Sequence, residues 1–188
     1  SELYDDIGVP FVSIDHEKAA FEATSYLLET GFEKIFYVQT YGDFIFDKLR
    51  LAGYKRALAK FGRPFDEWLI IKTDLNYSGG INAAKQILKS KIKKAGIFTV
   101  SDMIAISMVN YLNYKNVKIP ENYSVIGFDD IELCNATYPG ITTIHQPRIK
   151  IGKEACKLLI NRILKLNTSN TIQNKFLPHK LIKRGTTF

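Results

Sequence analysis

Short apolar segments alternate with helical patterns along most of the chain, and this alternation limits the possible folds more than any other feature. The strand-like segments are residues 11–14, 35–38, 69–71, 96–100, 124–128, 141–144 and 181–182. The helical patterns between them cover about 17–29, 47–60, 78–88, 102–112 and 147–164. Strands that alternate with helices of this length form βαβ units, whose right-handed crossovers place helices on both faces of a parallel sheet. The sequence therefore predicts an α/β fold.

The composition agrees with a chain that builds one large domain or two small ones. Of its 188 residues 46% are hydrophobic, which is enough for a core. No apolar run reaches the roughly eighteen residues that a membrane-spanning helix needs. Residues 1–10 lack the basic start and apolar stretch of a secretory leader. The polar stretch 167–174 predicts an exposed loop before the last strand.

The net charge of +7 raises the question of nucleic-acid binding. The lysines are spread over the predicted helix surfaces, which favours ordinary solvated side chains. A local excess runs from Arg148 to Arg184, where Glu154 is the one acidic residue. Aromatic residues do not interleave with these charges as they do in a groove that binds single strands. We therefore do not expect this segment to contact nucleic acid directly.

The cysteines and histidines do not form a metal or redox motif. Cys134 and Cys156 lie in unrelated contexts, and His16, His145 and His179 are scattered. We expect two unpaired thiols in a reducing compartment, and neither a metal nor a cofactor. The glycine-rich nucleotide-binding motifs and the serine-hydrolase elbow are also missing from the sequence. These observations argue against an enzyme.

Polar residues collect at the carboxyl ends of the predicted strands. In open parallel sheets, ligands bind beyond these ends, because the loops that follow the strands form a cleft there. The residues in question are Asp15, Gln39, Thr40, Thr73, Asp74, Leu75, Ser101, Asp102, Asp129 and Asp130. The pattern thus predicts a binding cleft along one edge of the sheet.

Seven segments, in this order and at these spacings, resemble the effector-binding region of LacI/GalR transcriptional regulators. They are 11–15 with Gly31, the RxxGY-type segment 50–54 with 57–58, 74–75 with 78–79, the NDxxA-type segment 101–105, the SVIGFDD segment 124–130, the LTTxxQP-type segment 141–147 with Gly152 and Ala155, and the LIxRxST-type segment 181–187. Singly each is weak, but together they extend from Val9 to Thr187.

The resemblance implies a type I periplasmic-binding-protein-like fold. It implies a crossover strand and first helix in 1–33, an effector-binding carboxyl-terminal subdomain in 34–145, and a return to the amino-terminal subdomain in 146–188. Members of the family begin with a helix-turn-helix head, a hinge helix and most of an amino-terminal subdomain. None of these is recognised here, so the expected chain is the family's sensor part without its head. Apolar residues of the last helix, such as Leu159 and Ile163, would then lose packing surface.

Arg50 and Asp129 are the strongest candidates for effector contact. The guanidinium of Arg50 donates paired hydrogen bonds, and the carboxylate of Asp129 accepts them from hydroxyl or ring N–H groups. The alternative for Arg50 is a helix-surface arginine paired with Asp47 or Asp43. The alternative for Asp129 is a cap of the following turn, a role that suits Asp130 better.

Ser101, Leu75, Phe46 and Asp15 complete the predicted site. Ser101 stands where the family usually has asparagine, and Leu75 where several members have an aromatic residue that stacks on the ligand. Phe46 offers a ring that Leu75 lacks, although it also suits the core. Ser101 and Asp15 also suit helix caps, and that alternative stays open for both.

The resemblance implies a sensor module of a cytoplasmic, homodimeric repressor, with no chemistry of its own. Its ligand would be a small effector, a sugar or related metabolite, and operator DNA would be bound only through the head. A periplasmic sugar-binding protein of an ABC transporter is the alternative, and an enzyme of the flavodoxin or dehydrogenase type is a third possibility. The segments 141–147 and 181–187 favour the repressor.

Overall fold

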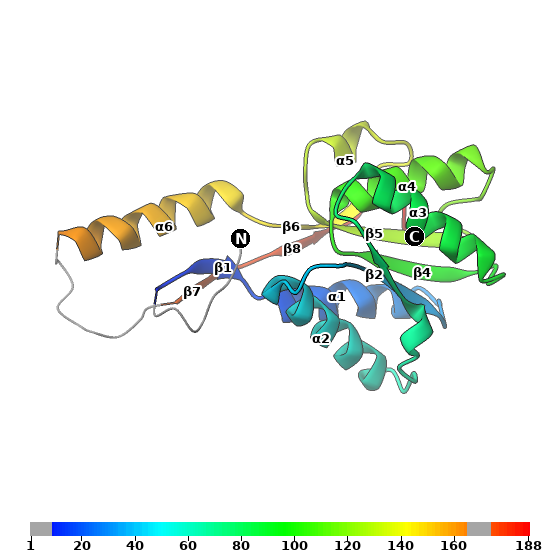
Figure 1. Cartoon of the computed structure of the whole chain (residues 1–188), viewed down its shortest axis with the longest axis horizontal. Coiled ribbons are helices and arrows are strands. Elements are labelled where there is room, and N and C mark those ends of the chain that lie inside the picture. The colour runs from blue at the N-terminus through cyan, green and yellow to red at the C-terminus, as the bar shows by residue number, and fades with distance from the viewer. Residues whose placement is uncertain (1–8, 165–173) are drawn as a thin grey trace.

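The computed structural model describes residues 9–164 and 174–188, and six of the strands in these residues form one sheet (Figure 1). In spatial order the strands are β3 (Ile70–Thr73), β2 (Ile35–Thr40), β4 (Ala95–Thr99), β5 (Tyr123–Asp129), β6 (Thr142–His145) and β8 (Lys180–Ile182). The first five are parallel, and β8 pairs with β6 in the antiparallel direction. The predicted α/β fold with a mainly parallel sheet is confirmed.

Two pairs of helices cover the sheet, one pair on each face (Figure 1). They are α1 (His16–Glu29) with α2 (Ile45–Lys60), and α3 (Tyr77–Lys89) with α4 (Asp102–Tyr114). Neighbouring residues of a strand point to opposite faces. In β2, Ile35 and Tyr37 therefore belong to the core under α1 and α2, whereas Phe36 and Val38 belong to the core under α3 and α4. The prediction of helices on both faces is confirmed.

The helices α1 and α2 approach each other so closely that one position admits only glycine. A Cβ atom on Gly53 of α2 would lie 2.1 Å from the carbonyl oxygen of Glu17 and 2.8 Å from the amide nitrogen of Phe21, both in α1. Because these are backbone atoms, a change of side-chain rotamer cannot relieve the clash. The contact fixes how deeply α2 sits on the sheet, and with it the position of Arg50, which precedes Gly53 by about one turn.

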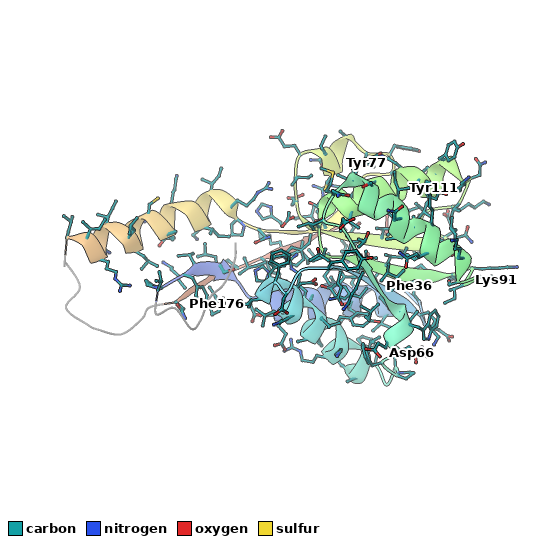
Figure 2. All side chains as sticks on the ribbon, in the orientation of Figure 1. Phe36, Asp66, Tyr77, Lys91, Tyr111 and Phe176 are labelled. Carbon is teal, nitrogen blue, oxygen red and sulfur yellow. The ribbon has the colours of Figure 1, made fainter. Side chains whose placement is uncertain are left out.

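A second, smaller group of elements extends away from the six-stranded sheet, and we call it the arm (Figure 1). It comprises β1 (Val12–Ile14), which pairs in parallel with β7 (Lys175–Leu177), and α6 (Arg148–Ile163), which contacts β1. No residue of α6 is buried, and the side chain of Ile163 is 67% exposed. Phe176 projects from the same region (Figure 2). Most apolar residues of α6 are therefore exposed in this structure, as the sequence led us to expect.

Several short elements were not predicted. They are the 3-10 turn η1 (Glu67–Leu69), the helix α5 (Leu133–Ala136) and the strand β7. Pro147, expected to open the last helix, is its N-cap residue instead. The expected loop 167–174 lies outside the described residues except for Asn174, which is exposed. The division at residues 33 and 145 stays a prediction, although α1 packs on α2 and β8 joins the main sheet.

None of the helices within 9–164 and 174–188 combines the length and the apolar character that crossing a membrane requires.

Candidate functional site

Arg50 lies at the centre of a cluster at the carboxyl ends of the strands. It is only 4% exposed, although it comes from the first half of α2. Its Nη1 atom donates a hydrogen bond of 2.5 Å to the carbonyl oxygen of Val100, just beyond β4. Its Cζ atom lies 3.4 Å from the ring centroid of Phe128 in β5 and 4.8 Å from that of Phe46. The structure thus brings the ends of two strands, β4 and β5, and the first turn of α2 together around one buried guanidinium.

The alternative interpretation of Arg50 as a surface residue paired with Asp47 or Asp43 is wrong. Asp43 forms an ion pair of 2.8 Å with Lys48. Asp47 is buried and accepts hydrogen bonds from the Tyr37 hydroxyl and, at 3.0 Å, from the Thr40 amide. Burial raises the pKa of the Asp47 carboxyl, and these hydrogen bonds oppose the rise. Asp47 therefore anchors the start of α2 to the end of β2.

The Arg50 guanidinium keeps unused donor capacity in spite of its burial. Its Nε atom is buried and has no hydrogen-bond partner within the described part of the chain. Burial lowers the pKa of Arg50, and the negative charge of Asp129 is the first of several that oppose this. An arginine does not lose its proton in a protein, so a buried cation with an unpaired N–H group remains. Burying such a group without a hydrogen-bond partner costs free energy, and an acceptor on a ligand would remove this cost.

Asp129 and Asp130 follow β5 and are held in different ways. Asp129 accepts a hydrogen bond of 2.6 Å from the Nε2 atom of Gln146, and burial raises its pKa while Arg50 opposes the rise. Asp130 forms an ion pair of 2.8 Å with Arg184 and a hydrogen bond of 2.8 Å with the Nδ1 atom of His145. Burial would raise the pKa of Asp130, but these two partners outweigh it and the pKa falls. Asp130 is therefore an anchor between strands, and not the turn cap that was expected.

The backbone at this pair is unusual. Asp129 has a φ of 120° and Asp130 a φ of 55°, in the half of the map that side chains disfavour. The partners of both carboxylates hold this conformation. The Asp129 carboxyl thereby stays at the carboxyl end of β5, where its charge acts on Arg50.

Ser101 and Asp15 both occupy the cap positions that were their alternative interpretations. The Ser101 hydroxyl accepts a hydrogen bond of 3.4 Å from the amide of Ile104, and the Asp15 carboxylate accepts one of 2.8 Å from the amide of Lys18. Each cap satisfies an amide that has no partner inside its helix. Effector contact by Ser101 or Asp15 stays a prediction.

The two apolar candidates differ in their surroundings. The ring of Phe46 stacks on that of Phe44 with 5.2 Å between centroids, and it lies against Arg50. Leu75 follows β3 at the edge of the sheet and is 48% exposed. Phe46 is therefore part of the cluster around Arg50, whereas Leu75 offers an exposed apolar surface after the edge strand. Their contact with a ligand stays a prediction.

Asp102, a neighbour of Ser101, is buried and ties elements of the fold together. It accepts a hydrogen bond of 2.5 Å from the Thr143 hydroxyl and one of 2.9 Å from the Ile131 amide. Burial raises the pKa of its carboxyl, and the Thr143 hydroxyl opposes the rise. The bonds tie α4 to β6 and to the loop after Asp130.

Sequence reasoning missed two residues of the cluster, His16 and Gln146. His16 is buried against Arg50, and Gln146 donates to Asp129. His16 directly follows Asp15, and Gln146 lies inside the segment 141–147 of the family resemblance, so these positions were the available signal. Beside Gln146 lies a hollow of about 400 Å³, lined by His145, Gln146, Pro147, Arg148, Ile149, Lys150 and Lys153.

The arrangement suits reversible binding of a small polar ligand. Arg50 supplies only donors, the carboxyl oxygens of Asp129 supply acceptors, and Phe46 supplies a flat apolar surface. Across the residues that the structure describes, no three His, Cys, Asp or Glu side chains gather into a possible metal site.

Curated relatives match this chain along its whole length. It is 32% identical over 187 residues to the HTH-type transcriptional repressor CytR of Escherichia coli, and this match covers 100% of the chain and 54% of the repressor. It is 32% identical over 180 residues to the catabolite control protein A of Priestia megaterium, covering 95% of the chain and 54% of that protein. The chain thus spans about half the length of the curated relatives it matches.

Solved structures and a family model agree with these relatives. The transcription regulator CcpA of Lactococcus lactis superposes with a TM-score of 0.91 at 28% identity, covering 100% of this chain and 68% of the other. A LacI family regulator from Enterococcus faecium with bound ribose gives 0.88 at 29% identity, covering 98% and 67%. The model of the periplasmic binding protein-like domain matches residues 24–187. The chain therefore belongs to the periplasmic binding protein-like domain family and is a homologue of LacI-type transcriptional repressors.

Proposed function

We propose that the chain is the effector-sensing module of a LacI-type transcriptional repressor. The observation that carries the proposal is the convergence of Arg50, Asp129 and Phe46 at the strand ends of a domain whose relatives are repressors. The module performs no chemistry. In this proposal the protein has two conformations, and an effector that binds one of them more tightly shifts the equilibrium toward it. The shift changes the affinity for operator DNA of a DNA-binding head that is separate from this module.

The effector class is a sugar or a related small polar metabolite. Paired donors on Arg50 and paired acceptors on Asp129 match vicinal hydroxyl groups, and the ring of Phe46 matches the apolar face of a sugar. Related regulators have been solved with ribose, with cellobiose and with phosphate. A periplasmic sugar-binding protein of a transporter is the alternative use of such a domain. The repressors and regulators among the relatives favour the sensor, and with it a cytoplasmic location.

Substitutions at Arg50 and Asp129 test the site. Arg50→Lys removes the paired donors and Asp129→Asn removes the charge, so each is expected to weaken effector binding by about 2 kcal/mol, or about thirtyfold. Titration calorimetry with ribose, cellobiose and inorganic phosphate measures the affinities, with Lys89→Gln on the far end of α3 as a control. Unchanged affinity in both variants, or no binding of any of the three by the unmodified chain, would contradict the proposal.

The whole protein is proposed to be a homodimer, as the family resemblance implies. Exposed aromatic side chains on the side of α3 and α4 support an interface with a second copy there. Tyr138 is 90% exposed and Tyr77 47%, and the half-buried Tyr111 lies near Tyr77 on α4 (Figure 2). Tyr77 also accepts a hydrogen bond of 3.2 Å from Asn110 of α4, which links the patch across both helices.

Sedimentation velocity of this chain tests the interface. We expect a dimer that Tyr138→Asp converts into a monomer, because a carboxylate buried without a partner opposes association. Lys91→Asn, just beyond the opposite end of α3, also lowers the net charge by one unit and should leave the dimer intact. A monomeric unmodified chain, or a dimer that tolerates Tyr138→Asp, would contradict this interface.

A further inference from the structure

His16 is buried next to Arg50, and the proposed effector contacts give it no role. It is the first residue of α1 and only 1% exposed, at the point where β1 of the arm meets the main body. Its Nδ1 atom lies 3.3 Å from Nη2 of Arg50, and its Nε2 atom lies 3.3 Å from the hydroxyl oxygen of Ser13. The imidazole therefore bridges the arm strand and the guanidinium of α2.

The partners of the ring determine where its proton must be. A guanidinium only donates hydrogen bonds, so Nδ1 can bind Arg50 only as an unprotonated acceptor. The ring proton then lies on Nε2, which donates to the Ser13 hydroxyl. Burial, and after it the positive charge of Arg50, lower the pKa of His16 to about 3. Both arguments lead to a neutral imidazole with one defined tautomer.

The bond from Arg50 to His16 completes the fixation of the guanidinium. Nη1 is held by the Val100 carbonyl, Nη2 by His16, and the plane by the ring of Phe128. Two acceptors on two different nitrogen atoms prevent the group from turning about its Cζ–Nε bond. The donors that remain are Nε and the second hydrogen on each of the two outer nitrogens.

We propose that His16 is a positioning residue that fixes the orientation of the Arg50 guanidinium and so determines which of its N–H groups are presented to the effector. The orienting role rests on the contacts of this chain alone. The effect on the effector rests on the proposed function. A rigid donor array loses less entropy when a ligand binds than a freely turning one does, and it selects ligands whose acceptors match its fixed geometry.

Nitrogen-15 NMR of this 188-residue chain tests the orienting role without any effector. In the unmodified chain we expect separate, slowly exchanging signals for the outer nitrogens of Arg50, assigned with Arg50→Lys. His16→Leu keeps the volume but removes the acceptor, so these signals should merge. His16→Asn places an amide oxygen near the position of Nδ1 and should separate them again. His179→Leu, which removes a bond of 3.0 Å to Glu22 and keeps both hydrogen bonds of His16, is the control.

Each result supports or overturns the role of His16. Separate Arg50 signals in a folded His16→Leu chain would overturn it, as would merged signals in His16→Asn. If His16→Leu fails to fold, the imidazole nitrogens of the unmodified chain decide the question. A proton on Nδ1, or a charged ring at neutral pH, is incompatible with the proposed acceptor.

Calorimetry with ribose then tests the consequence for binding. We expect His16→Leu to weaken ribose binding about tenfold, and His16→Asn to recover most of the loss, because only the former lacks the acceptor. Equal affinity of the leucine variant and the unmodified chain would overturn the effect on the effector. If ribose does not bind the unmodified chain, the proposed ligand class fails for ribose, while the NMR result still decides the orienting role.

Discussion

Acidification is expected to remove about 5 kcal/mol of the free energy of unfolding through His16 alone. The unfolded histidine takes up its proton near pH 6.5, whereas the folded one resists it until the pH reaches about 3. Between these values the unfolded state binds more protons, so the stability falls as the pH falls. A shift of this size, at roughly 1.4 kcal/mol for each pH unit, gives the expected figure. Above about pH 6.5 the contribution of His16 to the pH dependence ends.

Three buried carboxyls act in the opposite direction and must be separated from this effect. Burial raises the pKa values of Asp47, Asp102 and Asp129, so their protonation favours the folded state as the pH falls. Urea unfolding of the unmodified chain and of His16→Asn, from about pH 7 to about pH 4, cancels their contribution in the difference. We expect the unmodified chain to lose stability more steeply than the variant does. Parallel curves would show that His16 titrates normally.

Gly53→Ala is expected to destabilise the chain by about 3 kcal/mol, the upper range for an overpacked contact. The added methyl group would lie 2.1 Å from the Glu17 carbonyl oxygen and 2.8 Å from the Phe21 amide nitrogen. Both atoms belong to the backbone of α1, so the two helices must separate. Arg50 would move with α2, and the effector affinity should fall as well.

The same substitution elsewhere in the chain provides a matched control. Gly152 lies inside α6, and an added Cβ would meet nothing within 4 Å. Because alanine favours helices more than glycine does, Gly152→Ala should be neutral or should stabilise by up to about 1 kcal/mol. Urea unfolding followed by circular dichroism compares the two variants. If Gly53→Ala were no less stable than Gly152→Ala, the close approach of α1 and α2 would be wrong.

The layered fold could be predicted from the sequence because its signals are local. Segments such as 35–38 and 96–100 are apolar at consecutive positions, which indicates strands that are covered on both faces. The helices between them carry apolar stripes. The segments β7, η1 and α5 have only three or four residues each, too few for a period to be recognised. The antiparallel direction of β8 depends on its pairing with a strand nearly forty residues earlier, which no local pattern specifies.

The candidate site was predictable only in part, for a different physical reason. Arg50 and Asp129 follow from the family motifs, and the polar strand ends follow from the sheet. The burial of Arg50 depends on Phe46 and Phe128, which reach it from different elements. His16 is 34 positions away from Arg50 in the chain, and a lone histidine gives no indication of such a partner. Environments that are assembled from distant segments appear only after folding.

The hydrogen bond between Gln146 and Asp129 makes the base of α6 and the effector cleft share one acceptor. Gln146 stands between the last parallel strand and α6, so its amide is held wherever Asp129 is held. A ligand hydroxyl that donates to the Asp129 carboxylate in place of Gln146 frees the Gln146 amide, which lies just before α6. Equally, a movement of α6 that draws the Gln146 amide away leaves the Asp129 carboxylate without this hydrogen-bond donor. In the proposed sensor, the position of α6 and the occupancy of the cleft are therefore linked, and a change in either one shifts the other.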